Sequence, residues 1–179
     1  MKKFISLIVA MALGSLLVAC VDPDANSGST KQPMTTQQND KQYIDYPTSW
    51  SVIGVSGDTF ILLQSPDNHC RVNMFAPSPV QAIEVEGQID PVVFHTVYLV
   101  YEDRGYQFPD DHQREQHDGF ITEVSYFEYQ SESGVSERGY LVISVTDTQS
   151  YLFVLVADEQ AFSEYKELMS SIIESIKFE

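Results

Sequence analysis

Cysteine and basic side chains are both scarce in this chain of 179 residues. Two cysteines, Cys20 and Cys70, are too few for the disulfide framework that holds many small secreted domains together. Lysine and arginine total 10 against 26 aspartate and glutamate residues, which gives a formal net charge of −16. Nucleic acid and bare anionic lipid are poor partners for such a surface, because both are negatively charged. The acidic balance favours solubility and would attract a basic partner.

Long apolar runs and catalytic motifs are also missing from most of the sequence. After residue 20, no stretch approaches the ~18 to 20 uninterrupted apolar residues that a membrane-spanning helix needs. The sequence contains no G-x-S-x-G segment, no glycine-rich phosphate loop and no paired-histidine helix motif. Serine and histidine are present, but a catalytic triad is recognised by geometry, and nothing in the sequence places these residues together. The sequence therefore predicts no enzymatic activity.

The first twenty residues are the most informative part of the chain. Lys2 and Lys3 precede an apolar segment that is too short for a stable spanning helix and ends in small residues before Cys20. This pattern is typical of a cleaved export signal. The segment from Leu17 to Cys20 resembles the lipobox of bacterial lipoproteins. The resemblance implies that residues 1–19 are a signal peptide and that Cys20 carries a diacylglyceryl thioether and an N-acyl chain such as palmitate. The alternatives are an uncleaved anchor and a non-lipidated secretory signal.

A lipid on Cys20 would hold the protein on a membrane face. Each buried methylene contributes about 0.8 kcal/mol, so one acyl chain holds a protein marginally and two or more hold it stably. In enterobacterial lipoproteins an aspartate directly after the lipidated cysteine favours the inner membrane, and here that residue is Val21. Asp22 stands one position later than this rule requires. The resemblance therefore implies an envelope protein anchored in the outer membrane and facing the periplasm.

The segment 20–42 differs sharply in composition from the rest of the chain. It is rich in Ser, Thr, Gln, Asn, Pro and Gly and nearly free of apolar side chains, so it cannot bury enough surface to offset its ordering entropy. We predict a flexible tether with a typical reach of ~25 Å. Residues 43–179 are then one globular domain. Removal of residues 1–19 takes away two lysines and no acidic residue, which leaves eight basic against 26 acidic side chains and a formal charge of −18.

Hydrophobic periodicity in the domain predicts an α+β fold. Alternating runs bounded by turn residues predict strands at 49–53, 59–65, 70–75, 119–130, 140–145 and 151–156. A helix is expected from Asp90-Pro91 to Gly105, with a strand as its competitor because the segment is rich in valine. A second helix is expected to start at Asp158, with an apolar stripe formed by Phe162, Tyr165, Leu168, Met169, Ile172, Ile173 and Ile176. Strands in runs with helices among them indicate an antiparallel sheet with flanking helices.

Cys70 lies in one of the predicted strands. Alternation places Cys70, Val72 and Met74 on one face and Arg71 on the other, which predicts a buried thiol that packs as a small hydrophobe. The neighbouring His69 suggests a thiolate nucleophile. However, adjacent strand residues point to opposite faces, so this pair is poorly placed for proton transfer.

The layout of the domain resembles the PsbP/Mog1-like fold, which includes bacterial lipoproteins of the DcrB kind. The similarity lies in the Tyr-Pro-x-x-Trp segment at Tyr46 to Trp50, the turn at Ser65-Pro66, the three-strand meander near the end, and a last helix that ends in residues 172–178. The resemblance implies an α/β/α sandwich with the C-terminal helix packed on the sheet. Members of that fold act mainly as binding or assembly factors, among them photosystem accessory subunits, a regulator of a small GTPase and secretion chaperones.

One segment, 109–118, carries a weak metal-site pattern. Its candidate ligands are Asp110, Asp111, His112, His117 and Asp118. Imidazole and carboxylate together suit Zn²⁺, and the oxygens alone suit Ca²⁺. The spacing matches neither the paired-histidine zinc motif nor the calcium-loop motif, so a solvated loop with no metal, available as a contact surface, is the favoured interpretation.

The sequence supports three functional hypotheses. The leading one is a non-enzymatic, lipid-anchored protein that binds a protein or peptide partner, with no cofactor beyond the lipid on Cys20; an inhibitor or immunity protein against a basic toxin is its specific variant. The second is a metal-dependent or hydrolytic enzyme built around the 110–118 segment. The third is a small-ligand or lipid carrier, which requires an enclosed apolar pocket. Most of the ten Tyr and ten Phe residues, and the single Trp50, are expected in the core, and a minority of the aromatic residues could line a groove between sheet and helix.

Overall fold

The computed structural model describes most of the chain after residue 31. The described ranges are 32–39, 42–54, 60–80, 82–85, 88–109, 112–131 and 134–178. The predicted signal peptide and the predicted lipid site at Cys20 lie outside them. Of the helices in these ranges, none combines the length and the apolarity needed to cross a bilayer.

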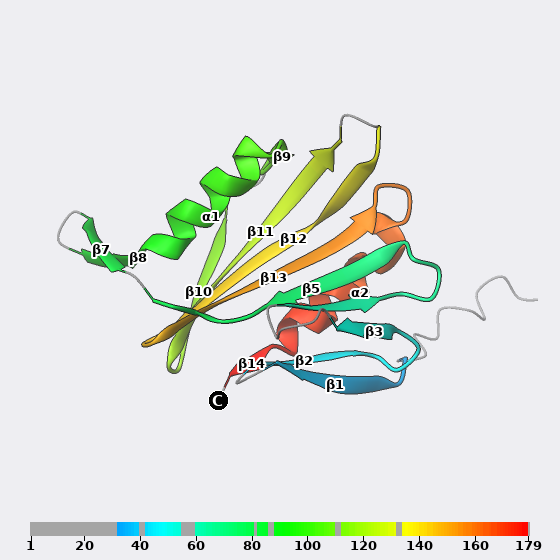
Figure 1. Cartoon of the computed structure of the whole chain (residues 1–179), viewed down its shortest axis with the longest axis horizontal. Coiled ribbons are helices and arrows are strands. Elements are labelled where there is room, and N and C mark those ends of the chain that lie inside the picture. The colour runs from blue at the N-terminus through cyan, green and yellow to red at the C-terminus, as the bar shows by residue number, and fades with distance from the viewer. Residues whose placement is uncertain are drawn as a thin grey trace, which may run out of the picture. The chain divides into compact units, whose positions relative to one another are not determined.

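An antiparallel sheet forms the centre of the described domain (Figure 1). Its strands, in spatial order, are β10 (Gln113–His117), β11 (Phe120–Gln130), β12 (Ser136–Thr146), β13 (Gln149–Asp158), β5 (Cys70–Phe75), β4 (Phe60–Gln64) and β3 (Ser51–Gly54). Two short strands extend it, with β6 (Ser78–Pro79) beside β13 and β9 (Tyr106–Gln107) beside β11. The predicted strands are all present, with ends that differ by a few residues. Long alternating runs such as β11 specify their register, because a one-residue slip would turn the apolar set toward solvent.

Two smaller groups of strands complete the fold. The first contains β1 (Met34–Asn39), β2 (Gln42–Pro47) and β14 (Lys177–Phe178), with β2 in the middle. The second is a hairpin of β7 (Ala82–Val85) and β8 (Gln88–Pro91).

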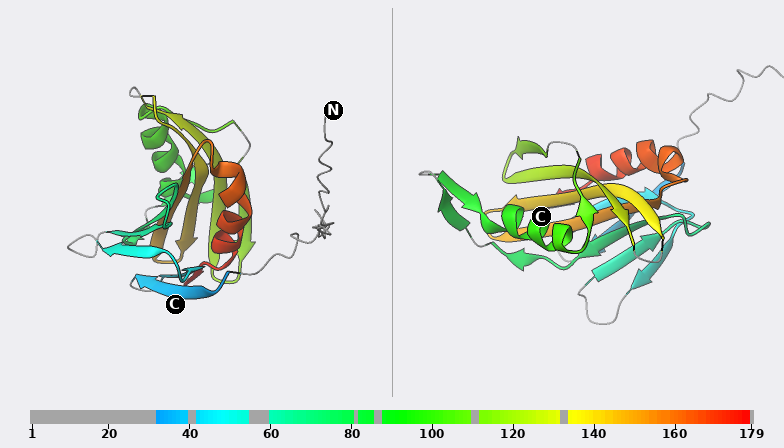
Figure 2. Two further views of the ribbon diagram at one scale, coloured as in Figure 1. Left: turned by 90° about the vertical axis from the view of Figure 1, so that its right-hand side faces the viewer. Right: turned by 90° about the horizontal axis from the view of Figure 1, so that it is seen from above.

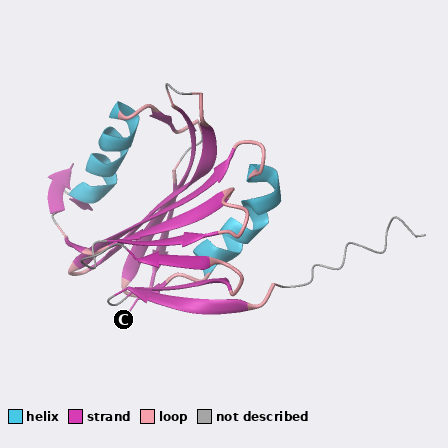
Figure 3. Cartoon of the chain, turned by 45° about the vertical axis from the view of Figure 1, so that its right-hand side comes forward, coloured by secondary structure: helices cyan, strands magenta, loops and turns pink. Residues whose placement is uncertain are grey.

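The two helices cover opposite faces of the central sheet. Helix α1 (Val92–Asp103) buries Phe94 and Tyr98 against Phe127 and neighbouring strand residues, and helix α2 (Phe162–Glu174) buries Met169 and others against the opposite face. Figures 2 and 3 show the sheet between the two helices. The predicted α+β fold, an α/β/α sandwich with the C-terminal helix on the sheet, is confirmed.

Both predicted helices exist, but the predicted start of the second was wrong. The segment before Gly105 is a helix rather than the competing strand, and Gly105 has a positive φ of 91°, as expected after a helix end. Asp158, the predicted helix start, is instead the last residue of β13, and α2 begins at Phe162. The strand persists because its last residues pair with both β12 and β5, and this pairing overrides the local capping signal.

The predicted tether was too long. Residues 34–39, assigned to it, form strand β1, which pairs with β2 along its whole length, and Pro33 accepts a hydrogen bond from the Thr48 amide. The strand is polar and mostly exposed, and backbone pairing and the Thr36–Asp45 side-chain bond hold it rather than burial of apolar surface. Amino-acid composition therefore did not predict strand β1.

Candidate functional site

An open groove lies between α2 and the uncovered part of the central sheet. Its volume is about 880 Å³. The sheet side comes from β10, β11 and β12, because α2 packs over β12 and β13 and leaves the outer strands uncovered. Such a groove between sheet and helix is what the surplus of aromatic residues suggested.

The strand register arranges the groove floor in rows. From the β10–β11 turn upward, the rows are His117 with Phe120, Glu115 with Thr122 and Ser144, Gln113 with Val124, and Tyr126 with Tyr140. Opposite them, α2 contributes Phe162, Lys166, Ser170, Ile173 and Glu174. Aromatic residues therefore lie at both ends of the groove, with smaller side chains between them.

The charges in the groove are divided between its two ends. Lys166 and Arg138 lie toward the Tyr126 end, whereas Glu115 and Glu174 lie toward the Phe120 end. Arg138 is oriented by ion pairs with Glu128 and Glu159. This arrangement of opposite charges suits a partner that is itself polar. A lipid carrier needs an enclosed apolar cavity, and this groove is neither enclosed nor apolar.

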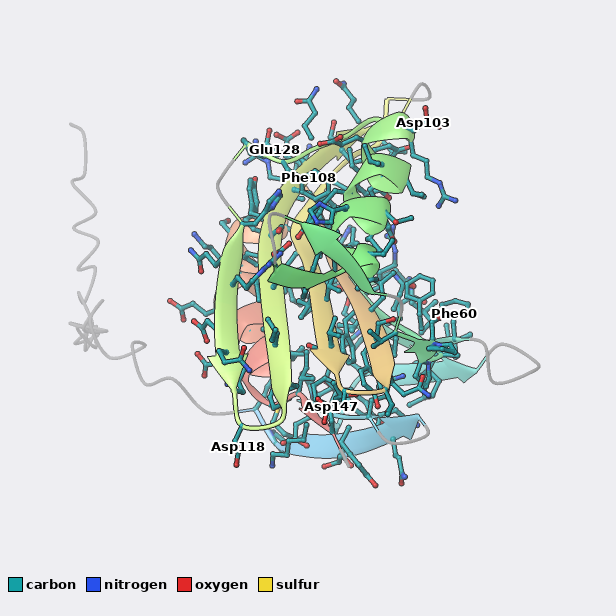
Figure 4. All side chains as sticks on the ribbon, turned by 90° about the vertical axis from the view of Figure 1, so that its left-hand side faces the viewer. Phe60, Asp103, Phe108, Asp118, Glu128 and Asp147 are labelled. Atoms are coloured by element: carbon teal, nitrogen blue, oxygen red, sulfur yellow. The ribbon has the colours of Figure 1, made fainter. Side chains whose placement is uncertain are left out.

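Residues 113–117 are a strand rather than part of the solvated loop that the composition of the 109–118 segment indicated. Residues 113–117 form β10 and pair with β11, and Figure 4 shows the hairpin with Asp118 at its tip. The sequence is polar because β10 is an edge strand whose residues are all exposed. Edge strands commonly carry charged side chains, which limit non-specific pairing.

The two histidines of that segment face opposite sides of the sheet. His112 stacks on Tyr98 of α1, with ring centroids 4.1 Å apart, whereas His117 stacks on Phe120 and lines the groove beside α2. They are therefore not placed to bind one metal ion together. Asp110 and Asp111 lie outside the described residues, and Asp118 is exposed at the turn. Within the described ranges, no group of three or more potential metal ligands comes together.

A serine and a histidine do meet, in a polar cluster under α1. The Nδ1 atom of His112 lies 2.7 Å from the hydroxyl of Ser125, which also bonds to the hydroxyl of Tyr98. Next to them, the Nε of Arg114 donates to Glu123 at 2.6 Å, and the guanidinium lies over the ring of Phe94. Burial raises the pKa of Tyr98. Sequence reasoning missed this contact because Ser125 lies 13 positions after His112, on the other side of a hairpin turn.

This cluster holds α1 on the sheet. Ser125 is 0% exposed, and its hydroxyl is bonded to two side chains. Its two bonds join α1 to the segment before β10, and the Arg114–Glu123 pair joins β10 to β11. A buried polar group without a partner is costly, so these bonds fix how α1 lies on the sheet.

Cys70 is the buried residue that strand alternation predicted. It is 1% exposed, and burial raises the pKa of its thiol to about 12. His69 points away and bonds to Asp158 at 2.6 Å, so it does not activate the thiol.

We expect Cys70 to resist alkylation in the native protein. Each pKa unit above the ambient pH lowers the thiolate fraction about tenfold, so at pH 8 iodoacetamide should label folded Cys70 at least ~100-fold more slowly than urea-unfolded Cys70. Mass spectrometry of timed samples gives both rates. Equal rates would contradict the assigned burial.

A second polar cluster joins the β4–β5 turn to α2. One oxygen of Asp67 accepts from the Ser65 hydroxyl at 2.6 Å and from the His69 amide, and the other accepts from the Tyr165 hydroxyl. The Ser65 bond, with help from the His69 amide, lowers the pKa of Asp67 to about 2. The bond to Asp158 raises the pKa of His69.

The Asp67 cluster predicts an acid-sensitive contribution to stability. Because its folded pKa is below the ordinary value of 3.8, the carboxylate stabilises the fold above pH ~4, and the effect is lost as the pH falls toward 2. Urea midpoints of the wild type and Asp67→Asn should therefore differ at pH 5 and converge as the pH approaches 2. A difference that does not change with pH would contradict the assigned role.

Comparison with known proteins identifies the fold. The solution structure of cyanobacterial PsbP (CyanoP) from Synechocystis sp. PCC 6803 is similar with a TM-score of 0.62 and 12% identity, covering 89% of this chain and 99% of that one. A crystal structure from Bacteroides thetaiotaomicron VPI-5482 is similar with a TM-score of 0.52 and 12% identity, covering 83% of this chain and 48% of that one. No protein-family model and no curated protein matches the chain. The domain therefore has the PsbP-like fold, as the sequence resemblance implied.

Proposed function

We propose that this chain is a lipoprotein of the bacterial cell envelope whose domain binds a protein or peptide partner in the groove between α2 and strands β10 to β12, without catalysing a reaction. The observation that supports this proposal most directly is the open groove itself. Cys20 supplies the lipid anchor, Val21 after it favours the outer membrane, and the domain then faces the periplasm.

The dimensions and chemistry of the groove support a peptide or a protein segment as its occupant. Binding sites for ligands typically measure ~300 to 1,000 Å³, and this groove is near the upper end of that range. Tyrosine side chains such as Tyr126 and Tyr140 are common anchors of protein interfaces because they offer a large apolar area and a polar tip. The separated charges at its two ends would orient a polar segment.

The fold comparison is compatible with a binding role, and the candidate nucleophiles of the described residues do not favour a catalytic one. Members of the family that the sequence resembles are mainly accessory or assembly factors. In the described residues, the thiol of Cys70 and the hydroxyl of Ser125 are both buried, and neither residue lines the groove.

The acidic surface favours a second candidate. A formal charge of −18 on the mature chain would attract a basic toxin, and the protein would then act as its inhibitor or immunity protein. Salt dependence separates the two candidates, because attraction between exposed charges weakens as ionic strength rises, whereas contacts with the aromatic groove depend on it less.

Two adjacent serines of α2 provide a matched test of the groove. Ser170 lines the groove and Ser171 does not, yet both are exposed and both donate to the carbonyl four residues earlier. Arginine at position 170 would obstruct the groove, while Ser171→Arg makes the same charge change outside it.

The experiment is affinity capture of the full-length protein from crosslinked envelopes. We expect Ser170→Arg to lower partner recovery about tenfold, which corresponds to ~1.4 kcal/mol of binding energy, and Ser171→Arg to leave it unchanged. Equal recovery with both variants would show that the partner binds elsewhere or that the groove is not a binding site.

A further inference from the structure

Strand β10 forms one edge of the central sheet. Its five residues are all exposed, and on the side away from β11 no other strand of the described ranges pairs with it. Figure 4 shows β10 as the outer strand of the hairpin that ends at Asp118. An open strand edge of this kind is a template for pairing with another strand.

The hairpin geometry determines which backbone groups point outward. Asp118 and Gly119 form the turn between β10 and β11, and His117 is paired with Phe120. In a hairpin with a two-residue turn, the residues that flank the turn form a hydrogen-bonded pair. His117 and Phe120 are therefore the first hydrogen-bonded pair of this hairpin. Hydrogen-bonded and non-hydrogen-bonded pairs alternate along an antiparallel ladder. The N–H and C=O of Gln116 therefore point toward the open edge.

The order of side chains on this edge is complementary to itself in one register. When two copies of β10 lie antiparallel about Gln116, Gln116 faces Gln116 and Glu115 faces His117, whose imidazole can donate a hydrogen bond to the Glu115 carboxylate. Arg114 takes no part in this pairing, because its guanidinium is bonded to Glu123 and lies over the ring of Phe94. Like charges directly across two strands are destabilising. A shift of the pairing centre to Glu115 places the two Glu115 side chains opposite each other. A shift to His117 places Glu115 opposite Gly119, where its carboxylate has no partner.

We propose that two copies of the chain associate through β10 in the register centred on Gln116, forming a two-fold dimer whose sheet continues across both copies. This inference goes beyond partner binding, although Glu115 and His117 of β10 also line the groove, and its membrane setting rests on the proposed lipid anchor. A two-fold axis perpendicular to the sheet keeps both grooves on the same face. Glu115 and His117, whose side chains lie 3.8 Å apart in one copy, line that groove, so the two grooves meet at the dimer axis.

The dimer is expected to form on the membrane rather than in dilute solution. One short strand edge buries less than the ~1,000 Å² typical of a stable interface. Attachment of both copies to one membrane raises their effective concentration and favours weak contacts. The association should therefore be measured in membranes that contain the full chain.

Cysteine crosslinking tests the register directly. In a hydrogen-bonded pair the Cα atoms are ~5.5 Å apart, which a disulfide can bridge, whereas diagonal neighbours are ~7–8 Å apart, which is too far. Gln116→Cys should therefore give at least tenfold more disulfide-linked dimer than the matched exposed variants Glu115→Cys and His117→Cys. Wild-type membranes serve as the control, because any disulfide-linked dimer in them forms through the native cysteines.

Three crosslinking results would overturn the proposal. They are no dimer at any position, equal dimer at all three, or a maximum at position 115 or 117. A maximum at either flanking position would identify a different register.

Exchange of the paired side chains provides a second test in the same membranes. Glu115→Lys removes the carboxylate that faces His117 in both symmetry-related pairs, so it should lower the yield of disulfide-linked dimer from Gln116→Cys about tenfold. Adding His117→Glu to the same chain places Lys opposite Glu and should restore the yield. The absence of an effect or of rescue would refute the pairing. Failure of the groove proposal would instead appear as unchanged partner capture by Ser170→Arg.

Discussion

Replacing Gly139 with alanine is expected to lower the free energy of unfolding by about 3 kcal/mol, because the added methyl group has no space. Gly139 lies in β12 directly opposite Phe127 of β11. A Cβ atom at this position would lie 1.9 Å from the carbonyl oxygen of Leu155 and 3.0 Å from the Phe127 ring. The first of these neighbours is backbone in the next strand of the ladder, so relief requires the strands to separate.

Gly54 provides the control for this substitution. It lies in the exposed edge strand β3, and no heavy atom would be within 4 Å of an added Cβ. Gly54→Ala should therefore change stability by no more than ~0.5 kcal/mol. Urea denaturation of both variants gives the comparison. Equal stability of the two would contradict the packing of β12 between its neighbours.

Replacing Cys20 with alanine is expected to abolish lipid attachment. The lipobox resemblance assigns the thioether to this sulfur, and alanine cannot form it. Cells fed a labelled fatty acid should incorporate label into the wild-type chain and none into Cys20→Ala. Fractionation alone is a weaker readout, because an unprocessed signal segment could itself hold the chain on the membrane.

Cys70→Ala is the matched control, since it removes the other cysteine and leaves the proposed anchor intact. It should incorporate label as the wild type does. Absence of label from the wild type, or label that persists in Cys20→Ala, would contradict the anchor.

Elements with a strong local period were predictable from the sequence. The apolar stripe of α2 and the alternation around Cys70 both identify a buried face, and the structure buries Met169, Ile172 and Cys70 as expected. Trp50 was likewise expected in the core, and it is 6% exposed against Tyr165. In each case the spacing of the apolar side chains predicts the buried face, because only one face of a helix or strand packs against the core.

Elements held by pairing rather than burial were not predictable. Strands β1 and β10 are polar and exposed, so their composition predicted a tether in place of β1 and a solvated loop in place of β10. The α2 start was placed too early because the end of β13 is stabilised by two neighbouring strands rather than by its own residues.

The candidate site was the least predictable part. Its floor combines alternate residues of three strands, and its wall is a helix that comes much later in the chain. Lys166 and Arg138 have no local motif that would mark them as groove residues. The histidine pair illustrates the opposite error, because His112 and His117 are close in sequence but face opposite sides of the sheet.

Site-specific photocrosslinking in living cells is the most direct test of partner binding in the groove. A photoreactive amino acid at Ser170 lies in the groove, and the same group at Ser171 lies one residue away outside it. We predict an adduct with a second, different protein from position 170 and none from position 171. Identical adduct patterns from both positions, or no adduct from position 170, would contradict a partner-binding groove.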